Sequence, residues 1–303
     1  MKTKKISQLK LEKEECSIVI ESICWTNCTS FEEADVIVLG VPDESKSHAL
    51  RKGTSEAPQH IRRISNIRDS YKRSKKKSLG LPYNNISARI YDCGDVDKKE
   101  IDSVYDKILS SGKIPILIGG DHSITVKAVE SVSKKVGQIS MVYFDAHPDF
   151  VSTRRNYYGS VFTDILQYID LSSSVQIGIR TPEKEEIENL NKHKIKVITP
   201  FEIMENGVKK VSEDILSLLG EHTYISFDMD CIDPAYAPGV SVPVPLGLRS
   251  VEATYILKKI VEHGMVAMDL MEVCPPYDIK DRTSHLASRI VGETISALLT
   301  KQG

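Results

Sequence analysis

Three ionisable residues stand at alternate positions where an apolar run ends. Residues 141–144 (MVYF) have the character of a buried strand, and Asp145, His147 and Asp149 follow in the segment DAHPDF. Side chains two residues apart on an extended segment point to the same side, so the three groups can converge on one locus. Carboxylates and imidazole gathered in this way are suited to binding a metal ion.

Three further segments share this arrangement of an apolar run followed at once by acids or histidine. They are GGDHS after 114–118, DMDCIDP after 223–227 and MEVCPP after 265–270. The groups that they add are Asp121, His122, Asp228, Asp230, Asp233 and Glu272. Each motif alone has an ordinary interpretation as a capping or turn device. Their shared position at the ends of predicted strands favours one common site instead.

The composition of this predicted site requires positive charge. Carboxylates at a shared site repel one another, so they cannot all remain ionised without cations. Four carboxylates and two imidazoles are available: His122, Asp145, His147, Asp149, Asp228 and Asp230. Two divalent ions would balance four carboxylates. Oxygen-rich ligands with some imidazole suit Mn²⁺ better than a structural zinc site, although zinc and cobalt are chemically compatible with them.

The elements that must position these residues alternate along the chain. Apolar runs predict strands at 35–41, 88–92, 114–118, 139–144, 174–179, 195–198, 223–227 and 265–270. Helical patterns lie between them or beyond the last, at 98–111, 122–135, 183–192, 208–219, 249–263 and 283–300. Continuous apolar strands separated by helices indicate a parallel sheet covered on both faces. A (β/α)8 barrel is the alternative on this pattern alone.

Composition and charge narrow the classes of function. The 303 residues are 41% hydrophobic and 27% charged, as in ordinary globular proteins. A net charge of -2 argues against a general nucleic-acid or membrane binder, and no apolar run is long enough to span a membrane. The first residues lack the apolar core of a signal peptide and six cysteines make no disulfide framework, so we expect a cytoplasmic location. The basic cluster YKRSKKK at 71–77 predicts a solvated loop, with a contact patch as the alternative.

Taken together, GGDHS, DAHPD and SFDMDCIDPAYAPG resemble the motifs of the ureohydrolase family, which includes arginase, agmatinase, guanidinobutyrase and formimidoylglutamase. The resemblance covers roughly residues 35–300, and the segment EVCPPYD is similar to agmatinase. It implies an arginase-like three-layer α/β/α sandwich around a mainly parallel sheet of about eight strands, which replaces the barrel. We expect a single domain over 1–303, with 1–33 as a peripheral N-terminal extension, and a homo-oligomer (trimer or hexamer).

The resemblance also implies a role for each residue of the site. The six ligands divide into one pair for each Mn²⁺ and one bridging pair: His122 with Asp149, His147 with Asp230, and Asp145 with Asp228. The two ions would share a water and lower its pKa, giving a hydroxide that attacks the amidine carbon. Glu272 would hold the guanidinium or amidine group, and Asp149 would pass a proton to the leaving amine. The expected reaction is hydrolysis of agmatine to putrescine and urea.

Three departures from the family pattern concern the substrate. Tyr158-Gly159-Ser160 stands where most relatives have His-Gly-Thr, and a tyrosine with a pKa of about 10 is a poorer proton shuttle. Val242 in GVSVP replaces a threonine of Gly-Thr-Gly-Thr-Pro. Arg154 and Arg155 of the substrate loop would favour an acid-ended substrate over agmatine, unless they face solvent.

Alternatives to agmatinase follow from these departures. APGVS and DRTSHLASR (281–289) look more like formimidoylglutamases, so a formimidoylglutamase or guanidino-acid hydrolase is the runner-up. A catalytically weak metal-binding protein that serves as a regulatory or assembly subunit is an alternative of another class, but the intact ligands argue against it. The ordered motifs disfavour a binuclear phosphoesterase. We expect a small guanidino or amidino substrate that contacts Glu272, Tyr158, Arg154 and Arg155, and no nucleic-acid or membrane partner.

Overall fold

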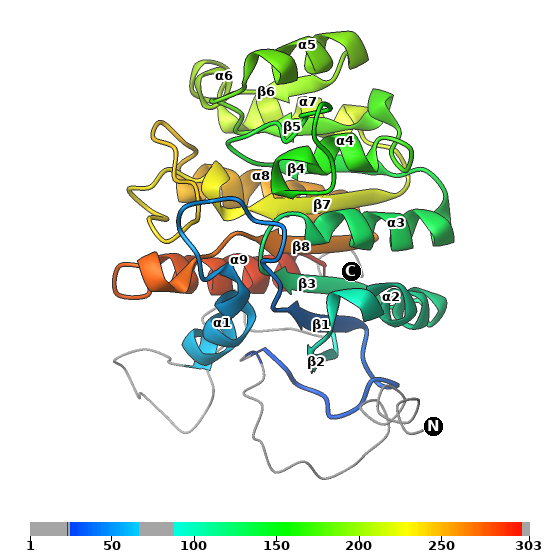
Figure 1. Ribbon diagram of the computed structural model, residues 1–303. Coiled ribbons are helices and arrows are strands. Elements are labelled where there is room, and N and C mark those ends of the chain that lie inside the picture. The colour runs from blue at the N-terminus through cyan, green and yellow to red at the C-terminus, as the bar shows by residue number, and fades with distance from the viewer. Residues whose placement is uncertain (1–22, 24, 67–87, 299–303) are drawn as a thin grey trace.

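A single parallel sheet forms the centre of the molecule (Figure 1). The computed structural model describes Ile23, residues 25–66 and residues 88–298. The strands are β1 (Val36–Val41), β2 (Ile90–Asp95), β3 (Ile114–Gly119), β4 (Ser140–Phe144), β5 (Val175–Ile177), β6 (Lys196–Ile198), β7 (Thr223–Asp228) and β8 (Ala267–Met271). Their order is β2-β1-β3-β8-β7-β4-β5-β6, and every pairing is parallel. The sheet is open, with β2 and β6 at its edges, so it is not a barrel.

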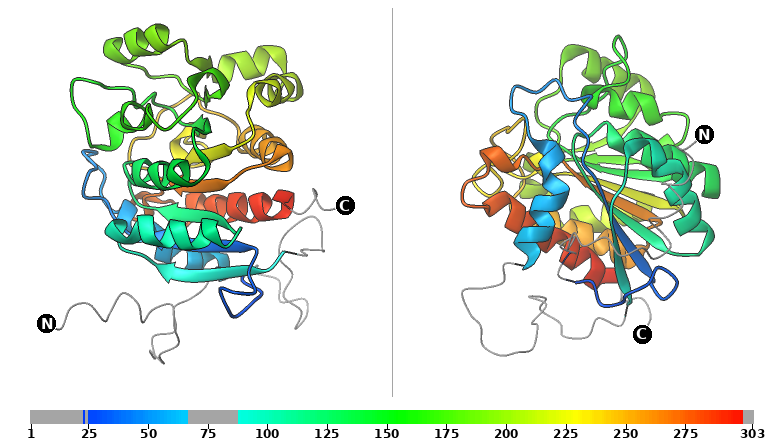
Figure 2. Two further views of the ribbon diagram at one scale, coloured as in Figure 1. Left: turned by 90° about the vertical axis from the view of Figure 1, so that its right-hand side faces the viewer. Right: turned by 60° about the horizontal axis from the view of Figure 1, so that its bottom comes forward.

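Helices cover both faces of this sheet, as the views in Figure 2 show. They are α1 (Ala57–Asn66), α2 (Ile101–Ser110), α3 (Ile124–Val136), α4 (Val161–Ile165), α5 (Lys184–His193), α6 (Pro200–Asn206), α7 (Val208–Leu218), α8 (Ser250–His263) and α9 (Arg282–Leu298). Helices α2 to α5 pack on one face, and α1 and α6 to α9 pack on the other. This arrangement confirms the predicted three-layer α/β/α sandwich.

Strand β1 shows why both faces are covered. Val36 and Val38 belong to the core shared with α1 and α9, whereas Ile37 and Leu39 belong to the core shared with α2 and α3. Successive strand residues point to opposite faces, so a continuous apolar run contributes to two cores. Removing these side chains from water contributes roughly 1.5–3 kcal/mol each to folding.

The predicted elements are found with boundaries that differ by a few residues. Strands β5 and β6 are the shortest of the sheet, at three residues each. Three helices were not predicted: α1, α4 and α6. Helices α4 and α6 have five and seven residues, which is too short to show a helical period. The start of α6 is nevertheless marked by Thr199, whose side chain accepts a hydrogen bond from the backbone N–H of Glu202.

Some predictions fall partly or wholly outside the described residues. The basic cluster at 71–77 lies outside them, as do residues 1–22 and 24 of the expected N-terminal extension. Within the described part of that segment, Ile23, Trp25 and Phe31 are buried in the two cores. The single-domain assignment stays a prediction. In the part of the chain that the structure describes, none of the helices has the length and apolar character needed to cross a membrane.

Candidate metal centre

The four motifs meet because the strands that carry them are neighbours. Strands β3, β8, β7 and β4 stand side by side in the middle of the sheet, so their carboxyl ends share one edge. His122 follows β3, Asp228 ends β7 and Glu272 follows β8. The segment from Asp145 to Asp149 follows β4. The order of strands therefore gathers residues that are far apart in the sequence.

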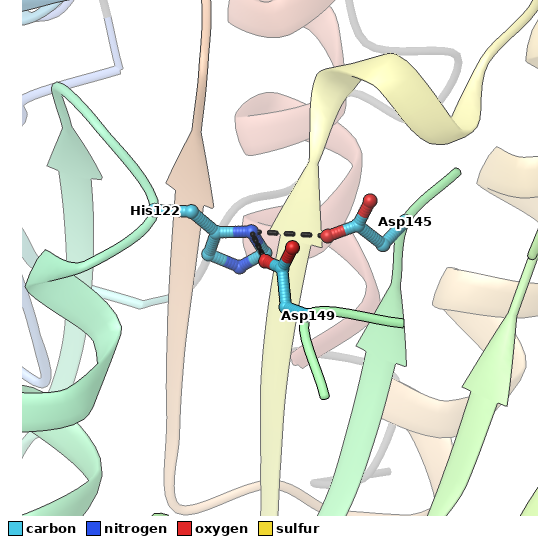
Figure 3. A group of neighbouring side chains, drawn as sticks. All are labelled: His122, Asp145 and Asp149. Atoms are coloured by element: carbon cyan, nitrogen blue, oxygen red, sulfur yellow. Dashed lines mark ion pairs between the residues drawn. The ribbon is translucent and has the colours of Figure 1, made fainter. Parts of the chain in front are cut away.

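One group of candidate ligands surrounds the Nδ1 atom of His122. This atom lies 3.1 Å from Asp145 Oδ2 and 3.3 Å from Asp149 Oδ2. Asp228 Oδ2 is also 3.1 Å away. Figure 3 shows the carboxylates of Asp145 and Asp149 beside the His122 ring. All four side chains are buried. An imidazole nitrogen that faces three buried carboxylates is a donor set suited to a divalent cation.

A second group shares Asp145 with the first. Asp145 Oδ1 lies 3.3 Å from His147 Nδ1, and the same nitrogen lies 3.0 Å from Asp230 Oδ2. Asp230 is buried and His147 is partly exposed. Each oxygen of Asp145 therefore faces a different group, which is the arrangement that a residue needs to bridge two ions.

The electrostatics of the cluster fit bound cations. Burial and the neighbouring carboxylates raise the pKa of Asp149, and raise that of Asp228 well above its usual value. Burial opposes the charged form of His122, but hydrogen bonds to Asp145, Asp149 and Asp228 raise its pKa well above the ordinary range. Protonated histidine is thus the countercharge of the metal-free cluster. A divalent ion would supply that charge instead, so the residues present fit a metal site.

The DAHPD segment brings its side chains together by turning. The chain bends directly after β4, and Asp145 Oδ1 accepts a hydrogen bond from the backbone N–H of His147 at 2.6 Å. Asp149 has a φ of 48°, in the left-handed region. Gly178 makes room for this turn, because a Cβ atom there would lie 2.8 Å from the carbonyl oxygen of Asp145. The side chains of Asp145, His147 and Asp149 do converge, but the predicted reason, an extended segment with alternating side chains, is wrong. The turn brings them together.

Glu272 lies beside the cluster and outside both ligand groups. Its Oε1 accepts a hydrogen bond from the backbone N–H of His122 at 2.8 Å, and its Oε2 accepts one from Ser241 Oγ. Burial is the main cause that raises its pKa to about 8. Its φ of 65° is a strained value for glutamate, and such strain is concentrated at functional sites. The carboxylate is thus held at the cavity without being a candidate metal ligand.

A small cavity opens over the cluster. Its lining combines the six candidate ligands with four further residues: Tyr158, Ser241, Val242 and Glu272. Burial raises the pKa of the Tyr158 phenol, so this group is neutral at neutral pH. A larger cavity of about 780 Å³ lies between α5, β6 and α6, and none of the candidate ligands lines it.

The two arginines of the predicted substrate loop have different surroundings. Neither arginine lines the small cavity over the candidate ligands. Arg155 Nε donates to Asp164 Oδ1 at 2.6 Å. Arg154 Nη2 lies 3.2 Å from His48 Nε2, and the His48 ring stacks on Tyr158 with 6.2 Å between the centroids. Arg154 is thus one residue removed from the cavity wall, whereas Arg155 is held away by an acid.

Sequence reasoning missed side chains that support the ligands. Tyr143 stacks on His122, and its hydroxyl donates to Asp149 Oδ2 at 2.6 Å. Arg180 donates to the carbonyl oxygen of Asp230 at 2.7 Å. In the sequence Tyr143 has the character of a strand residue within the apolar run 141–144, and its contact with Asp149 depends on the fold. Arg180 follows strand β5 at the end of residues 177–180 (IGIR), and its contact with Asp230 likewise depends on the fold.

Known proteins are similar to this chain in sequence and in fold. The sequence model of the arginase family matches residues 34–296. An agmatinase of Neisseria meningitidis serogroup C (strain 053442) is 34% identical over 281 residues, which cover 86% of each chain. The part matched by the family model contains all eight strands of the described sheet.

Solved structures are similar over nearly the whole chain. The agmatine ureohydrolase of Thermoplasma volcanium has a TM-score of 0.79 and 30% identity, over 96% of this chain and 97% of that one. The proclavaminate amidino hydrolase from Streptomyces clavuligerus has a TM-score of 0.79 and 30% identity, over 88% and 93%. These likenesses support a ureohydrolase enzyme over a non-catalytic subunit. The chain belongs to the arginase family and is an agmatinase-like ureohydrolase.

Proposed function

We propose that this protein is a dinuclear manganese hydrolase that cleaves a C–N bond of a guanidino or amidino substrate, with agmatine as the first candidate. The observation that carries the proposal is the position of Asp145 between two groups of ligands, with Glu272 in the same cavity. Such a site can hold a cationic amidine next to a nucleophile. Four carboxylates and two imidazoles suit Mn²⁺.

Each residue of the site would have its own role in the reaction. His122 and Asp149 would hold one metal ion, and His147 and Asp230 would hold the other. Asp145 and Asp228 would hold both ions. When bound, the two ions would supply a water whose pKa is lowered toward neutrality. Glu272 would orient the cationic group of the substrate by charge-assisted hydrogen bonds. Asp149, held by the Tyr143 hydroxyl, would carry a proton to the leaving amine.

Agmatine is preferred because the similar proteins include an agmatinase and an agmatine ureohydrolase. Its hydrolysis would release putrescine and urea. The homo-oligomer and the cytoplasmic location expected from the sequence belong to the same proposal. They are supported by the family resemblance and by the composition of the chain.

A substrate with an acidic far end is the second candidate, and the surroundings of Arg154 favour it. Within the described residues, Arg154 contacts His48 and the Tyr157 ring and pairs with no carboxylate. A cation near the entrance would attract a carboxylate tail and repel the ammonium of agmatine. Val242 lines the cavity. The family resemblance implies a threonine at this position, so valine would remove a hydroxyl from the guanidinium pocket. Formimidoylglutamate and guanidino acids have the matching chemistry.

A substrate panel tests the proposed function. The Mn²⁺-loaded protein would be given agmatine, arginine, guanidinobutyrate and formimidoylglutamate, with urea and formamide measured separately. We expect urea from agmatine. Formamide from formimidoylglutamate, with no urea from agmatine, would replace the first candidate by the second. No product from any of the four would contradict the hydrolase proposal.

Arg154→Ala and Arg155→Ala form a matched pair that separates the two candidates. With agmatine as substrate, we expect neither variant to change kcat/KM by more than roughly threefold, because exposed charges are screened at physiological salt. With an acid-ended substrate, Arg154→Ala would raise KM by roughly tenfold, the loss of about 1.4 kcal/mol. Kinetics on agmatine and formimidoylglutamate at low and high salt measure this. A large effect of Arg155→Ala alone would contradict the placement of these side chains.

A further inference from the structure

Asp269 is a buried carboxylate that the proposed reaction does not use. It lies in the middle of β8 and is 0% exposed. Three hydroxyl groups donate hydrogen bonds to it over 2.6–2.8 Å, those of Thr125, Tyr224 and Ser226. None of the ion pairs in the described part of the chain includes it. Burial raises the pKa of its carboxyl group, and the nearby charge of His122 is the largest of the influences that act in the opposite direction. Burying an ionised carboxylate costs free energy unless hydrogen bonds or an opposite charge stabilise it. The link between Asp269 and His122 is therefore of interest.

That link passes through Ser226. Ser226 Oγ lies 2.7 Å from Asp269 Oδ1 and 2.8 Å from His122 Nε2. An ionised carboxylate can only accept, so the one proton of Ser226 goes to Asp269, and Ser226 accepts a hydrogen bond from His122 Nε2–H. When a metal ion takes the place of the proton on Nδ1, the one proton left on the ring is therefore on Nε2, and Nδ1 offers its lone pair to the ion. This is the atom that faces the carboxylates of Asp145 and Asp228.

The sheet itself builds this connection. Ser226 and Asp269 are direct partners in the register of β7 and β8, and β3, which leads to His122, is the other neighbour of β8. Tyr143 stacks on His122 with the ring planes 4° apart, which fixes the plane of the imidazole. Stacking alone does not decide which ring atoms face the ligands. The hydrogen bond to Ser226 makes that choice.

We infer that Asp269, acting through Ser226, is a positioning residue for metal binding at His122. The inference rests on the proposed function. The pair would hold the proton on Nε2, so that Nδ1 could donate its lone pair to the metal ion held by His122 and Asp149. Groups that fix the tautomer and the orientation of a metal-binding histidine raise metal affinity. The effect is confined to that ion, because His147 hydrogen bonds to neither residue.

Titration of the metal-free full chain with Mn²⁺ tests this inference. Calorimetry would compare the parent with Ser226→Ala. Ser140→Ala is the matched control, because Ser140 is another buried strand serine whose hydroxyl bonds to Ser173. We expect Ser226→Ala to weaken one of two Mn²⁺ sites by roughly 10- to 100-fold and to leave the other site unchanged. Ser140→Ala is expected to leave both sites as in the parent.

The outcomes distinguish this inference from the proposed function. A parent protein that binds fewer than two ions would contradict the dinuclear function. A parent with two sites, and a Ser226→Ala variant that keeps both affinities or weakens both equally, would overturn the positioning role alone. Thermal unfolding of the metal-free proteins reports on folding separately. If Ser226→Ala does not fold, Asp269→Asn enters the same titration and decides between the same outcomes.

Discussion

Asp145→Asn is expected to lose both metal ions and, with them, hydrolysis down to the background rate. Asp145 offers one oxygen to the His122 group and the other to the His147 group, at 3.1 and 3.3 Å from the two Nδ1 atoms. Asparagine keeps the size of the side chain but removes its charge and turns one oxygen into an N–H₂ donor. The ion that faces this donor would lose a ligand, and the ion on the other side would lose the negative charge that the two ions share.

Asp230→Asn gives the comparison that makes this prediction specific. Asp230 faces only the His147 group, so its loss is expected to remove one ion and leave the other. Asp121→Asn is the control for changing a buried acid, because Asp121 holds Ser123 and the backbone N–H of Lys46 and does not line the cavity. Metal content after Mn²⁺ loading and gel filtration measures all three. Retention of one ion by Asp145→Asn would show that this residue is not shared.

Much of this fold follows from local patterns in the sequence. A strand such as 114–118 reads as a continuous apolar run because both of its faces are buried, and that pattern identifies a parallel sheet covered by helices. The order of the strands is a different matter. Nothing local places β8 between β3 and β7, and it is this order that brings Glu272 to His122.

The site divides in the same way. His122 and Asp228 are visible in the sequence because ionisable groups directly after apolar runs are unusual. The contacts that support them depend on register and packing. Ser226 meets Asp269 only because β7 and β8 pair in one particular alignment. The pattern of apolar residues along a strand does not show how two strands are aligned, so the sequence alone could not predict this pair.

Neighbours in sequence can also separate in space. Arg154 and Arg155 were treated as one basic feature of the substrate loop. The structure gives Arg155 a carboxylate partner in α4 and leaves Arg154 beside His48. Whether an arginine of this loop faces solvent or substrate therefore has to be decided separately for Arg154 and Arg155, from their tertiary contacts.

Glu272→Gln is expected to reduce kcat/KM steeply while metal content stays at the level of the parent. The carboxylate is buried, and burial raises its pKa to about 8, so a cationic amidine that binds beside it would stabilise the ionised form. Removing one partner of a buried, hydrogen-bonded charge pair costs about 2–5 kcal/mol, or roughly 30- to 5,000-fold. The loss falls on the substrate because Glu272 belongs to neither ligand group.

The glutamine variant is suited to this test because the site can accommodate it. Its amide oxygen can accept the backbone N–H of His122, as Glu272 Oε1 does, and Ser241 can rotate its hydroxyl to accept from the amide N–H₂. Glu293→Gln is the matched control. Glu293, in α9, is also buried, but it pairs with Lys258 in α8 and does not line the cavity over the ligands. Steady-state kinetics and metal analysis of the three proteins separate the possibilities. Loss of metal in Glu272→Gln would make this residue part of the metal centre, and unchanged hydrolysis would remove it from substrate binding.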